Sequence, residues 1–204
     1  MIEQFIGSIG DKYSIILEKS NGGFATVYLV KDNKTNKEYA AKVLDRDDYY
    51  ESEFAINKIL KDLNIPNVVK FIVEGNDLIT LKKKEPEKKK YLIFEYYSKE
   101  NLLSYIKHSG GLKEIYSKVL FKKLLETIQL LHNNGIFHLD LKLNNILLDG
   151  KYNPIIADFG FSKTIKESIN NKFSGSFGTN KYMPPQMFLD EKFDGTKADI
   201  LYFT

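Results

Sequence analysis

Residues 138–145 read HLDLKLNN, between a stretch with helical spacing and a short apolar run. Within them, Asp140, Lys142, Asn144 and Asn145 are interleaved with leucines. A plain surface turn has no need of this alternation. A loop that holds a base, a cation and a metal ligand on one rigid stretch does need it, with its leucines turned toward a core. The stretch therefore predicts a functional loop, and the rest of the chain should supply the other parts of a site.

The composition is that of a soluble globular protein. The chain has 204 residues, of which 43% are hydrophobic and 28% charged, enough for one large domain or two small lobes. Its formal net charge of +3 is too small to favour nucleic acid or an anionic membrane as a partner. The absence of cysteine excludes disulfides, thiol catalysis and Cys-based zinc sites. No apolar run has the length of a signal peptide or a membrane span, so we expect a soluble, cytoplasmic protein.

The first half of the chain reads as strands around one helix. Short β-branched and aromatic runs separated by turn residues predict five strands, at residues 13–17, 25–31, 38–44, 68–73 and 91–96. Apolar residues at helical spacing predict a helix over residues 48–63. The lysine-rich run KKKEPEKKK at 82–90 lies between two of the strands. A solvated hairpin tip is favoured there over a nucleic-acid or membrane patch.

The second half is mainly helical. Residues 115–133 carry apolar residues at i, i+3 and i+4, and Gly135 follows as a stop signal. The apolar face of this helix is expected to comprise Val119, Leu124, Leu125, Ile128 and Leu131. The predicted fold class is therefore α+β with two lobes. Residues 1–97 would form a strand-rich lobe with a five-stranded sheet and one helix, and residues 98–204 a mainly helical lobe, with a hinge near residues 95–99.

Two features of the first lobe are candidates for binding phosphate. In SNGGFATVY at 20–28, Gly22 and Gly23 can adopt positive φ and let backbone N–H groups approach phosphate oxygens, although a simple tight turn has the same signature. In YAAKVL, Lys42 interrupts an apolar run, where an unpaired charge is expensive. It is either a lysine that reaches the surface at a sheet edge or a cation for phosphates, held by a carboxylate on the following helix.

A metal site is suggested by ADFG at 157–160. Asp158 ends a buried strand and is followed two residues later by a glycine, which suits a carboxylate presented at a chain reversal. Asn145 offers a neutral oxygen, a ligand type compatible with Mg²⁺. Asp140 has no second carboxylate nearby in the sequence, so it is available to accept a proton.

Four motifs, YAAKVL, HLDLKLNNILL, ADFG and GTNKYMPPQ, occur in this order. On these motifs the chain resembles the eukaryotic protein kinase family, from about residue 13 to residue 200. The resemblance implies a protein-kinase-like two-lobed fold and transfer of the γ-phosphoryl group of ATP to a protein hydroxyl, with ATP and Mg²⁺ as cofactors. Lys142 and Thr179 are similar to residues of the serine/threonine branch.

The resemblance also implies roles for single residues. Lys42 would bind the α- and β-phosphates, and Asn145 and Asp158 would bind Mg²⁺. Asp140 would orient the attacking hydroxyl and take its proton, while Lys142 would offset charge on the transferred group. Val27, Ala40 and Leu147 would enclose adenine, and backbone groups of Glu95 and Tyr97 would bond its edge. The implied nucleotide-binding set is Ser20, Gly22, Gly23, Ala25, Val27, Ala40, Lys42, Glu95, Tyr97 and Leu147.

The chain departs from the family pattern in its first lobe. Ser20 and Ala25 stand where the family has glycines. The glutamate that should pair with Lys42 is ambiguous in register. Counting back from Pro66 without gaps gives Ile56, whereas a short insertion after the helix gives Glu53, which we expect to be the partner.

Further departures lie in the second lobe. Leu139 replaces an arginine that usually pairs with a phosphorylated residue, so activity should not depend on phosphorylation of the segment that follows ADFG. The candidate phosphorylation sites there are Ser168, Ser174, Ser176 and Thr179. His138 should be structural and pack near Phe159, and His108 and His132 are assigned no role.

The final residues, KADILYFT at 197–204, resemble the start of the long helix that anchors the second lobe in this family. Asp199 would brace the backbone of the loop at 138–145. The sequence then stops, so the second lobe is expected to be incomplete. Two functions stay open: an active serine/threonine kinase, and a non-catalytic kinase-like module or fragment that binds a nucleotide or a partner.

Overall fold

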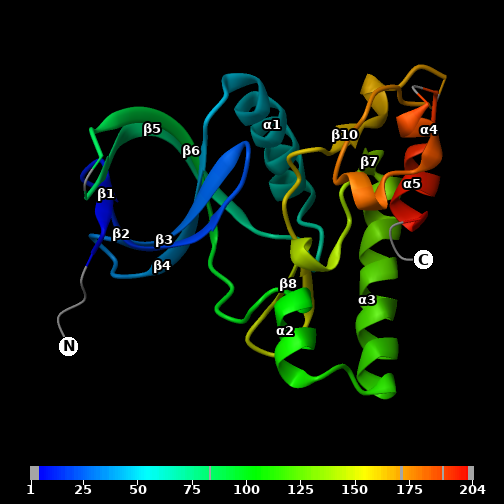
Figure 1. The fold of residues 1–204 in the computed structure, drawn as a ribbon, viewed down its shortest axis with the longest axis horizontal. Helices are drawn as coiled ribbons and strands as arrows, with labels where there is room; N and C mark the ends of the chain where they lie inside the picture. Colours follow the sequence, from blue (N-terminus) through cyan, green and yellow to red (C-terminus); the bar gives the residue numbers. More distant parts are fainter. Residues whose placement is uncertain (1–4, 83, 171, 190, 202–204) are drawn as a thin grey trace. The chain divides into compact units, whose positions relative to one another are not determined.

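The computed structural model describes residues 5–82, 84–170, 172–189 and 191–201. The chain divides into two compact units (Figure 1). The first comprises Met1–Lys58 and Lys70–Tyr96, and the second comprises Ile59–Val69 and Tyr97–Thr204. The division after Tyr96 lies beside the boundary expected at residue 97. Residues 59–69, which the sequence analysis placed in the first lobe, belong to the second unit.

The first unit is a closed antiparallel barrel of six strands in the order β1-β2-β3-β4-β6-β5, which form a ring in Figure 1. The strands are β1 (Gly7–Ile9), β2 (Tyr13–Asn21), β3 (Ala25–Asp32), β4 (Glu38–Leu44), β5 (Phe71–Leu81) and β6 (Glu87–Glu95). The expectation of five strands was wrong because β1 is only three residues long and begins with a glycine. A Cβ on Gly7 would lie 2.1 Å from the carbonyl oxygen of Thr80, so this glycine permits close strand approach rather than a turn.

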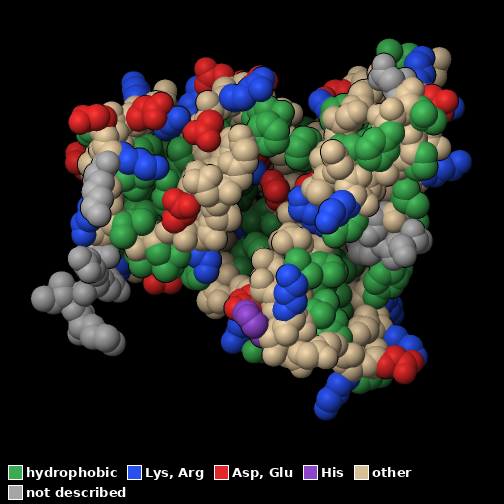
Figure 2. All heavy atoms as spheres, in the orientation of Figure 1, with side chains coloured by type: hydrophobic (Ala, Val, Ile, Leu, Met, Phe, Trp, Pro, Cys, Tyr) green, Lys and Arg blue, Asp and Glu red, His purple; other side chains and the backbone are tan. Residues whose placement is uncertain are grey.

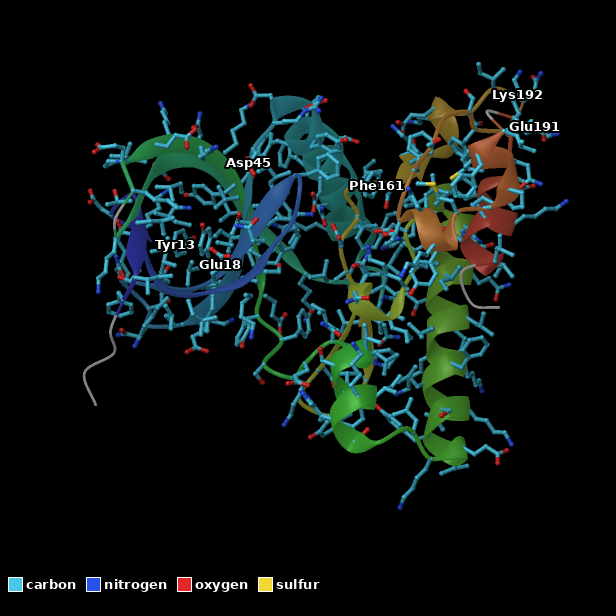
Figure 3. All side chains as sticks on the ribbon, in the orientation of Figure 1. Tyr13, Glu18, Asp45, Phe161, Glu191 and Lys192 are labelled. Carbon is cyan, nitrogen blue, oxygen red and sulfur yellow. The ribbon has the colours of Figure 1, made fainter. Side chains whose placement is uncertain are left out.

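Apolar side chains at alternate strand positions fill the interior of the barrel. Ala41 and Val43 of β4 are buried in the same apolar cluster as Val30, Tyr91 and Ile93. Tyr13 belongs to this cluster too, and its side chain lies within the ring of strands in Figure 3. Because side chains alternate between the two faces of a strand, Lys42 lies on the opposite face from Ala41 and Val43. The strand pattern therefore keeps the lysine out of the barrel core.

The lysine-rich run is not purely a solvated tip. β6 begins at Glu87, so Lys88, Lys89 and Lys90 are strand residues, and Lys83 lies outside the described residues. Lys89 pairs with Asp45 at 3.0 Å, and Lys90 pairs with Glu51 at 2.8 Å. Basic and acidic side chains also lie interspersed on the visible face of this unit (Figure 2). These lysines therefore take part in ion pairs within the unit.

One helix, α1 (Asp47–Leu63), follows β4 and begins with two acidic residues, Asp47 and Asp48. Acidic side chains in a first turn are favourable because they face the unpaired N–H groups of the helix. The predicted range of 48–63 agrees with it to one residue. This helix supplies the partner of Lys42 described below.

The second unit contains the remaining helices and two short antiparallel pairs, β7 with β10 and β8 with β9. Its longer elements are α2 (Leu102–Ser109), α3 (Glu114–Asn133), α4 (Pro185–Phe188) and α5 (Gly195–Leu201). Its strands are β7 (Ile136–Phe137), β8 (Ile146–Leu148), β9 (Pro154–Ile156) and β10 (Lys163–Thr164). Short 3-10 turns are η1 (Leu143–Asn145), η2 (Ile165–Glu167) and η3 (Asn180–Tyr182).

The buried face of α3 differs in part from the expected one. Leu124, Ile128 and Leu131 are buried as expected, and Leu120 joins them. Val119 and Leu125 were placed on this face but are exposed. Apolar residues at 119–121 and 124–125 allow more than one helical stripe, so spacing alone did not fix which stripe is buried.

No helix within the described ranges is long and apolar enough to cross a membrane.

Candidate active site

The buried carboxylate of Asp140 is the centre of the site in the second unit. Its Oδ2 accepts hydrogen bonds from Lys142 Nζ at 2.7 Å and from Asn145 Nδ2 at 3.1 Å. Its Oδ1 accepts from Thr179 Oγ1 at 2.8 Å. An ionised carboxylate that is 1% exposed is costly unless it is paired and hydrogen-bonded. These contacts meet that requirement and hold the carboxylate in one orientation.

Asp140, Lys142 and Thr179 form a closed triangle of hydrogen bonds. Besides its bond to Asp140, Lys142 Nζ donates to Thr179 Oγ1 at 2.7 Å. The hydroxyl of Thr179 thus accepts from the lysine and donates to the aspartate, and each group has its polarity satisfied. The three residues place a carboxylate beside a cation, with a hydroxyl that orders both.

The leucines of the loop at 138–145 face the core only in part. Leu139 and Leu141 are fully buried, whereas Leu143 is exposed and so does not face the core as we expected. Leu139 adopts a left-handed conformation, with φ of 61°. Such a backbone is unfavourable for a leucine, so it requires support from its surroundings.

Asp199 of α5 provides that support. Its Oδ1 accepts from the backbone N–H of Leu139 at 2.7 Å, and its Oδ2 accepts from that of His138 at 2.9 Å. The expected contact between Asp199 and the loop backbone is therefore present. Since these amides lie immediately before Asp140, Asp199 fixes the backbone from which the Asp140 carboxylate projects.

His132 was missed in the sequence analysis. At the end of α3, its Nε2 donates to Asp199 Oδ2 at 2.8 Å, and its ring stacks on Phe137 with centroids 5.4 Å apart. It therefore orients the aspartate that holds the loop. Its partner lies 67 positions further along the chain, so no local pattern could identify the contact.

His138 links the loop to ADFG and is not placed as a base. Its ring lies 4.7 Å from that of Phe159, as expected. Its Nε2 contacts the carbonyl oxygen of Ala157 at 3.0 Å, and its Nδ1 accepts from the backbone N–H of Asp140 at 3.3 Å. These contacts assign the proton of a neutral ring to Nε2, so both ring nitrogens are occupied in structural bonds.

Asn145 and Asp158 are the candidate metal ligands. The amide nitrogen of Asn145 donates to the backbone oxygen of Asp140 at 2.9 Å as well as to its carboxylate, which leaves the amide oxygen for a cation. The backbone oxygen of Asn145 accepts from the N–H of Ala157 at 2.8 Å, next to Asp158. Asp158 has φ of 65°, the left-handed turn expected where a strand reverses.

The Asn145 amide oxygen and the Asp158 carboxylate suit Mg²⁺, which does not require all of its ligands from protein. Within the described ranges, no group of three or more His, Cys, Asp or Glu side chains could hold a metal ion. Mg²⁺ is typically bound through one or two carboxylates together with substrate phosphates and water. One carboxylate and one amide oxygen therefore fit a metal that arrives with a nucleotide.

In the first unit, Lys42 is paired with Glu53. Its Nζ lies 2.7 Å from both Oε1 and Oε2 of the glutamate, which is buried on α1. Ile56, the alternative in an ungapped register, lies in the apolar interior. The structure thus brings together Lys42 and the expected Glu53, rather than leaving the lysine as a solvated edge residue.

The candidate adenine residues of the first unit share a face with Lys42. Val27 is directly opposite Lys42 in the β3–β4 pair, and Ala40 lies two residues earlier on β4. On β6, Phe94 is opposite Ala40. Leu147 lies on β8 of the second unit, and Tyr97 begins that unit. The N–H of Glu95 donates to the carbonyl oxygen of Lys70 at 2.9 Å.

The glycine-containing turn differs from its expected geometry. Neither Gly22 nor Gly23 has positive φ, and the N–H of Gly22 donates to the carbonyl oxygen of Ala25 at 3.0 Å. Ser20 belongs to β2, opposite Val27, and Ala25 is the first residue of β3. A Cβ on Gly23 would meet no atom within 4 Å, so the backbone there is open to an approaching ligand. The turn is thus a tight hairpin whose tip carries accessible amides.

The segment after ADFG is fastened beside the loop. β10 pairs with β7, with Lys163 opposite Phe137 and Thr164 opposite Ile136. The Glu167 carboxylate accepts from Lys163 Nζ at 2.8 Å and from the backbone N–H of Thr164 at 2.7 Å. Because β7 leads directly into His138, the pairing connects this segment to the loop that carries Asp140.

Comparison with known proteins gives a consistent result. A family model described as the protein kinase domain matches residues 19–201. The chain is 31% identical to CBL-interacting serine/threonine-protein kinase 13 of Arabidopsis thaliana, over 93% of this chain and 37% of that protein. It is 30% identical to CBL-interacting protein kinase 10 of Oryza sativa subsp. japonica, over 98% of this chain and 44% of that protein. The chain therefore spans less than half the length of these curated relatives.

Proposed function

The chain belongs to the protein kinase family, and on that basis we propose that it is a serine/threonine protein kinase, which transfers the γ-phosphoryl group of Mg·ATP to a protein hydroxyl. The two units would be the N-terminal and C-terminal lobes of a kinase fold. The observation that carries the proposal is the triangle of Asp140, Lys142 and Thr179, with 2.7–2.8 Å between bonded atoms. A cytoplasmic location accords with the use of ATP.

Asp140 would act as the base. Oδ1 accepts from Thr179 and retains a lone pair for the substrate hydroxyl, whose proton it would take as the oxygen attacks phosphorus. Lys142 Nζ, held 2.7 Å from Asp140, would stabilise the negative charge that develops on the transferred group. Mg·ATP, when bound, supplies the phosphoryl group and a cation that offsets phosphate charge, and the ADP leaving group takes the electron pair of the broken bond.

The other site residues would position the nucleotide. Lys42, held by Glu53, would bind the α- and β-phosphates, and Asn145 and Asp158 would bind Mg²⁺. The turn of Gly22 and Gly23, between Ser20 and Ala25, would lie over the phosphates, with the open backbone at Gly23 facing them. Adenine would contact Val27, Ala40 and Leu147 and bond to the carbonyl of Glu95 and a backbone group of Tyr97.

Preference for serine or threonine rests on Lys142 and its partner. A lysine two residues after the base, bonded to Thr179, is the pattern expected of the serine/threonine branch. Both relatives are named as protein kinases, and the one from Arabidopsis thaliana as a serine/threonine-protein kinase.

We also propose that activity is independent of phosphorylation in the segment after ADFG. Leu139, where an arginine would bind a phosphate, is buried and apolar. Lys163, a basic residue of that segment, is paired with Glu167. Phosphatase treatment should therefore leave the transfer rate unchanged. Complete loss of transfer in a treated, monodisperse sample would contradict this proposal.

The proposed function is tested by transfer of labelled γ-phosphate from Mg·ATP to a basic generic protein substrate. We expect Asp140→Asn to lower the rate by roughly 10²- to 10⁴-fold, because the amide cannot accept the proton. Asp11→Asn, which changes an exposed carboxylate, is the matched control and should retain the rate. If the unmutated chain binds Mg·ATP but transfers nothing, the chain is a nucleotide-binding module rather than an enzyme.

A further inference from the structure

Phe24, at the turn between β2 and β3, stacks on Tyr49 of α1. The ring centroids are 4.4 Å apart and the planes differ by 27°. Phe24 remains 41% exposed, so it is not simply part of the barrel core. Its carbonyl oxygen also accepts from the backbone N–H of Asp45, which Figure 3 labels on the chain segment between β4 and α1, at 3.1 Å. The turn is thus attached near the start of α1 by its ring and by its backbone.

Tyr49 lies one helical turn before Glu53 on the same helix. Residues four positions apart are neighbours on a helix surface. Glu53 binds Lys42, so the turn that carries Gly22 and Gly23 and the lysine are connected to adjacent positions of α1. The Arg46 guanidinium lies 5.0 Å from the Tyr49 ring and is itself bonded to Asp48 at 2.6 Å, which further orders the tyrosine.

We propose that Phe24 and Tyr49 are positioning residues that hold the glycine-containing turn in register with the Lys42–Glu53 pair. The inference rests on the proposed function, in which this turn and Lys42 bind the same phosphates. The turn has two consecutive glycines, which are conformationally permissive, and one short backbone bond across it. A turn ordered before the nucleotide arrives avoids part of the ordering cost of binding.

The stack is tested by single and double substitutions that remove each ring. Phe24→Ala, Tyr49→Ala and the double variant are compared with the unmutated chain. Tyr49→Phe keeps the ring and controls for the hydroxyl. Leu78→Ala is a matched control for the loss of an exposed apolar side chain, because β5 pairs with neither β2 nor β3. Amide hydrogen exchange at Gly22 and Gly23 reports on the turn, and calorimetric titration with Mg·ATP reports on binding.

We expect faster exchange at both glycines and roughly two- to tenfold weaker binding of Mg·ATP in either alanine variant, the range of an aromatic pair. The double variant should be no weaker than the worse single variant, since both remove one contact. Tyr49→Phe and Leu78→Ala should resemble the unmutated chain.

Two results would overturn the proposal. Unchanged exchange at Gly22 and Gly23 in Phe24→Ala would show that the stack does not order the turn, whether or not nucleotide binds. Additive effects of the two alanine substitutions on binding would show that the rings act separately. The proposed function fails differently: the unmutated chain would then transfer no phosphoryl group from Mg·ATP, although exchange at the turn could still respond to the substitutions.

Discussion

The carboxylate of Asp199 and the backbone amide of Leu139 are joined by a hydrogen bond of 2.7 Å across 60 positions of sequence. The contact stabilises a left-handed leucine immediately before Asp140. A residue of α5 thereby orients the backbone that carries the Asp140 carboxylate.

Asp199→Asn should lower both stability and transfer. An amide at this site presents an N–H₂ group to at least one of the two backbone N–H donors and leaves it unsatisfied, at a cost of about 1–3 kcal/mol. We expect a lower melting temperature and a reduced transfer rate with little change in Mg·ATP affinity. Asp11→Asn, which changes an exposed carboxylate, is the control. An unchanged melting temperature for Asp199→Asn would contradict the bracing role.

Thr179→Ala should reduce transfer without removing nucleotide binding. The substitution releases one oxygen of Asp140 and one bond of Lys142, and loss of such orientation costs roughly 10- to 100-fold in rate. Thr179→Ser keeps the hydroxyl and should retain most of the rate. The measurement is single-turnover transfer at saturating Mg·ATP. Equal rates for the serine and alanine variants would show that the hydroxyl has no positioning role.

Glu53→Gln should weaken nucleotide binding and destabilise the first unit. Removing one partner of a buried ion pair leaves the other charge uncompensated, here at a cost of about 1–3 kcal/mol, because Lys42 is partly accessible. The control is Glu51→Gln on the same helix, which breaks a largely exposed pair with Lys90. Urea unfolding and Mg·ATP titration provide the two readouts. Equal effects of the two substitutions would contradict a special role for Glu53.

The stability contributed by Glu167 should depend on pH. Partial burial raises the pKa of this carboxyl, but hydrogen bonds from Lys163 and from the Thr164 backbone outweigh it, so the pKa lies below the ordinary value of 4.5. A depressed pKa in the folded state gives stability that is present above the unfolded pKa and is lost as pH falls through the folded one. The side chain is 42% exposed, so the effect should be small.

The measurement is the melting temperature of the chain and of Glu167→Gln from pH 7 to pH 3. The variant should melt lower at pH 7, and the difference should shrink as the pH falls below 4.5, the ordinary value for this carboxyl. Glu114→Gln removes another lysine–glutamate pair with the same spacing, at 2.6 Å to Lys118, and is the matched control. A difference that persisted unchanged at pH 3 would exclude the charge of Glu167 as its cause.

Asn57→Leu should stabilise the protein. Asn57 is fully buried on α1, and its Oδ1 has no hydrogen-bond partner among the described residues. A buried unsatisfied oxygen is costly, so an apolar side chain of similar size should raise the free energy of unfolding by about 1 kcal/mol. Urea unfolding measures this change, and Asn57→Asp, which buries a charge, should have the opposite effect. Destabilisation by leucine would indicate that the amide is satisfied in solution.

The polar residues of the loop at 138–145 could be identified from the sequence, but the contacts that hold this loop in place could not. Asp140, Lys142 and Asn145 lie within six positions, and their spacing follows from one short stretch of chain. His132 and Asp199 support that loop through contacts between distant residues, which local spacing does not reveal. The pairing of Lys42 lay between these cases. A helix after β4 was predictable. Whether Glu53 or Ile56 faces Lys42 depended on how that helix is rotated about its own axis.

The errors have similar causes. Positive φ at Gly22 and Gly23 was one of two possibilities beside a simple tight turn, and the hairpin closed by the bond from Gly22 to Ala25 is the tight turn. The exposed positions of Val119 and Leu125 depend on which stripe of α3 is covered, and neighbouring apolar residues made several stripes acceptable. In both places the local pattern permitted more than one conformation, and packing selected among them.

The short strand β1 bears on how this protein behaves at high concentration. By pairing with both β2 and β5, its three residues leave the barrel without a free strand edge. An open edge is a template for pairing with another chain and thus for aggregation. A proline at Ser8 would remove one backbone donor from this seam and expose the flanking strands. Resistance of the molecule to aggregation thus depends on a three-residue segment that adds one side chain, Ile9, to the core.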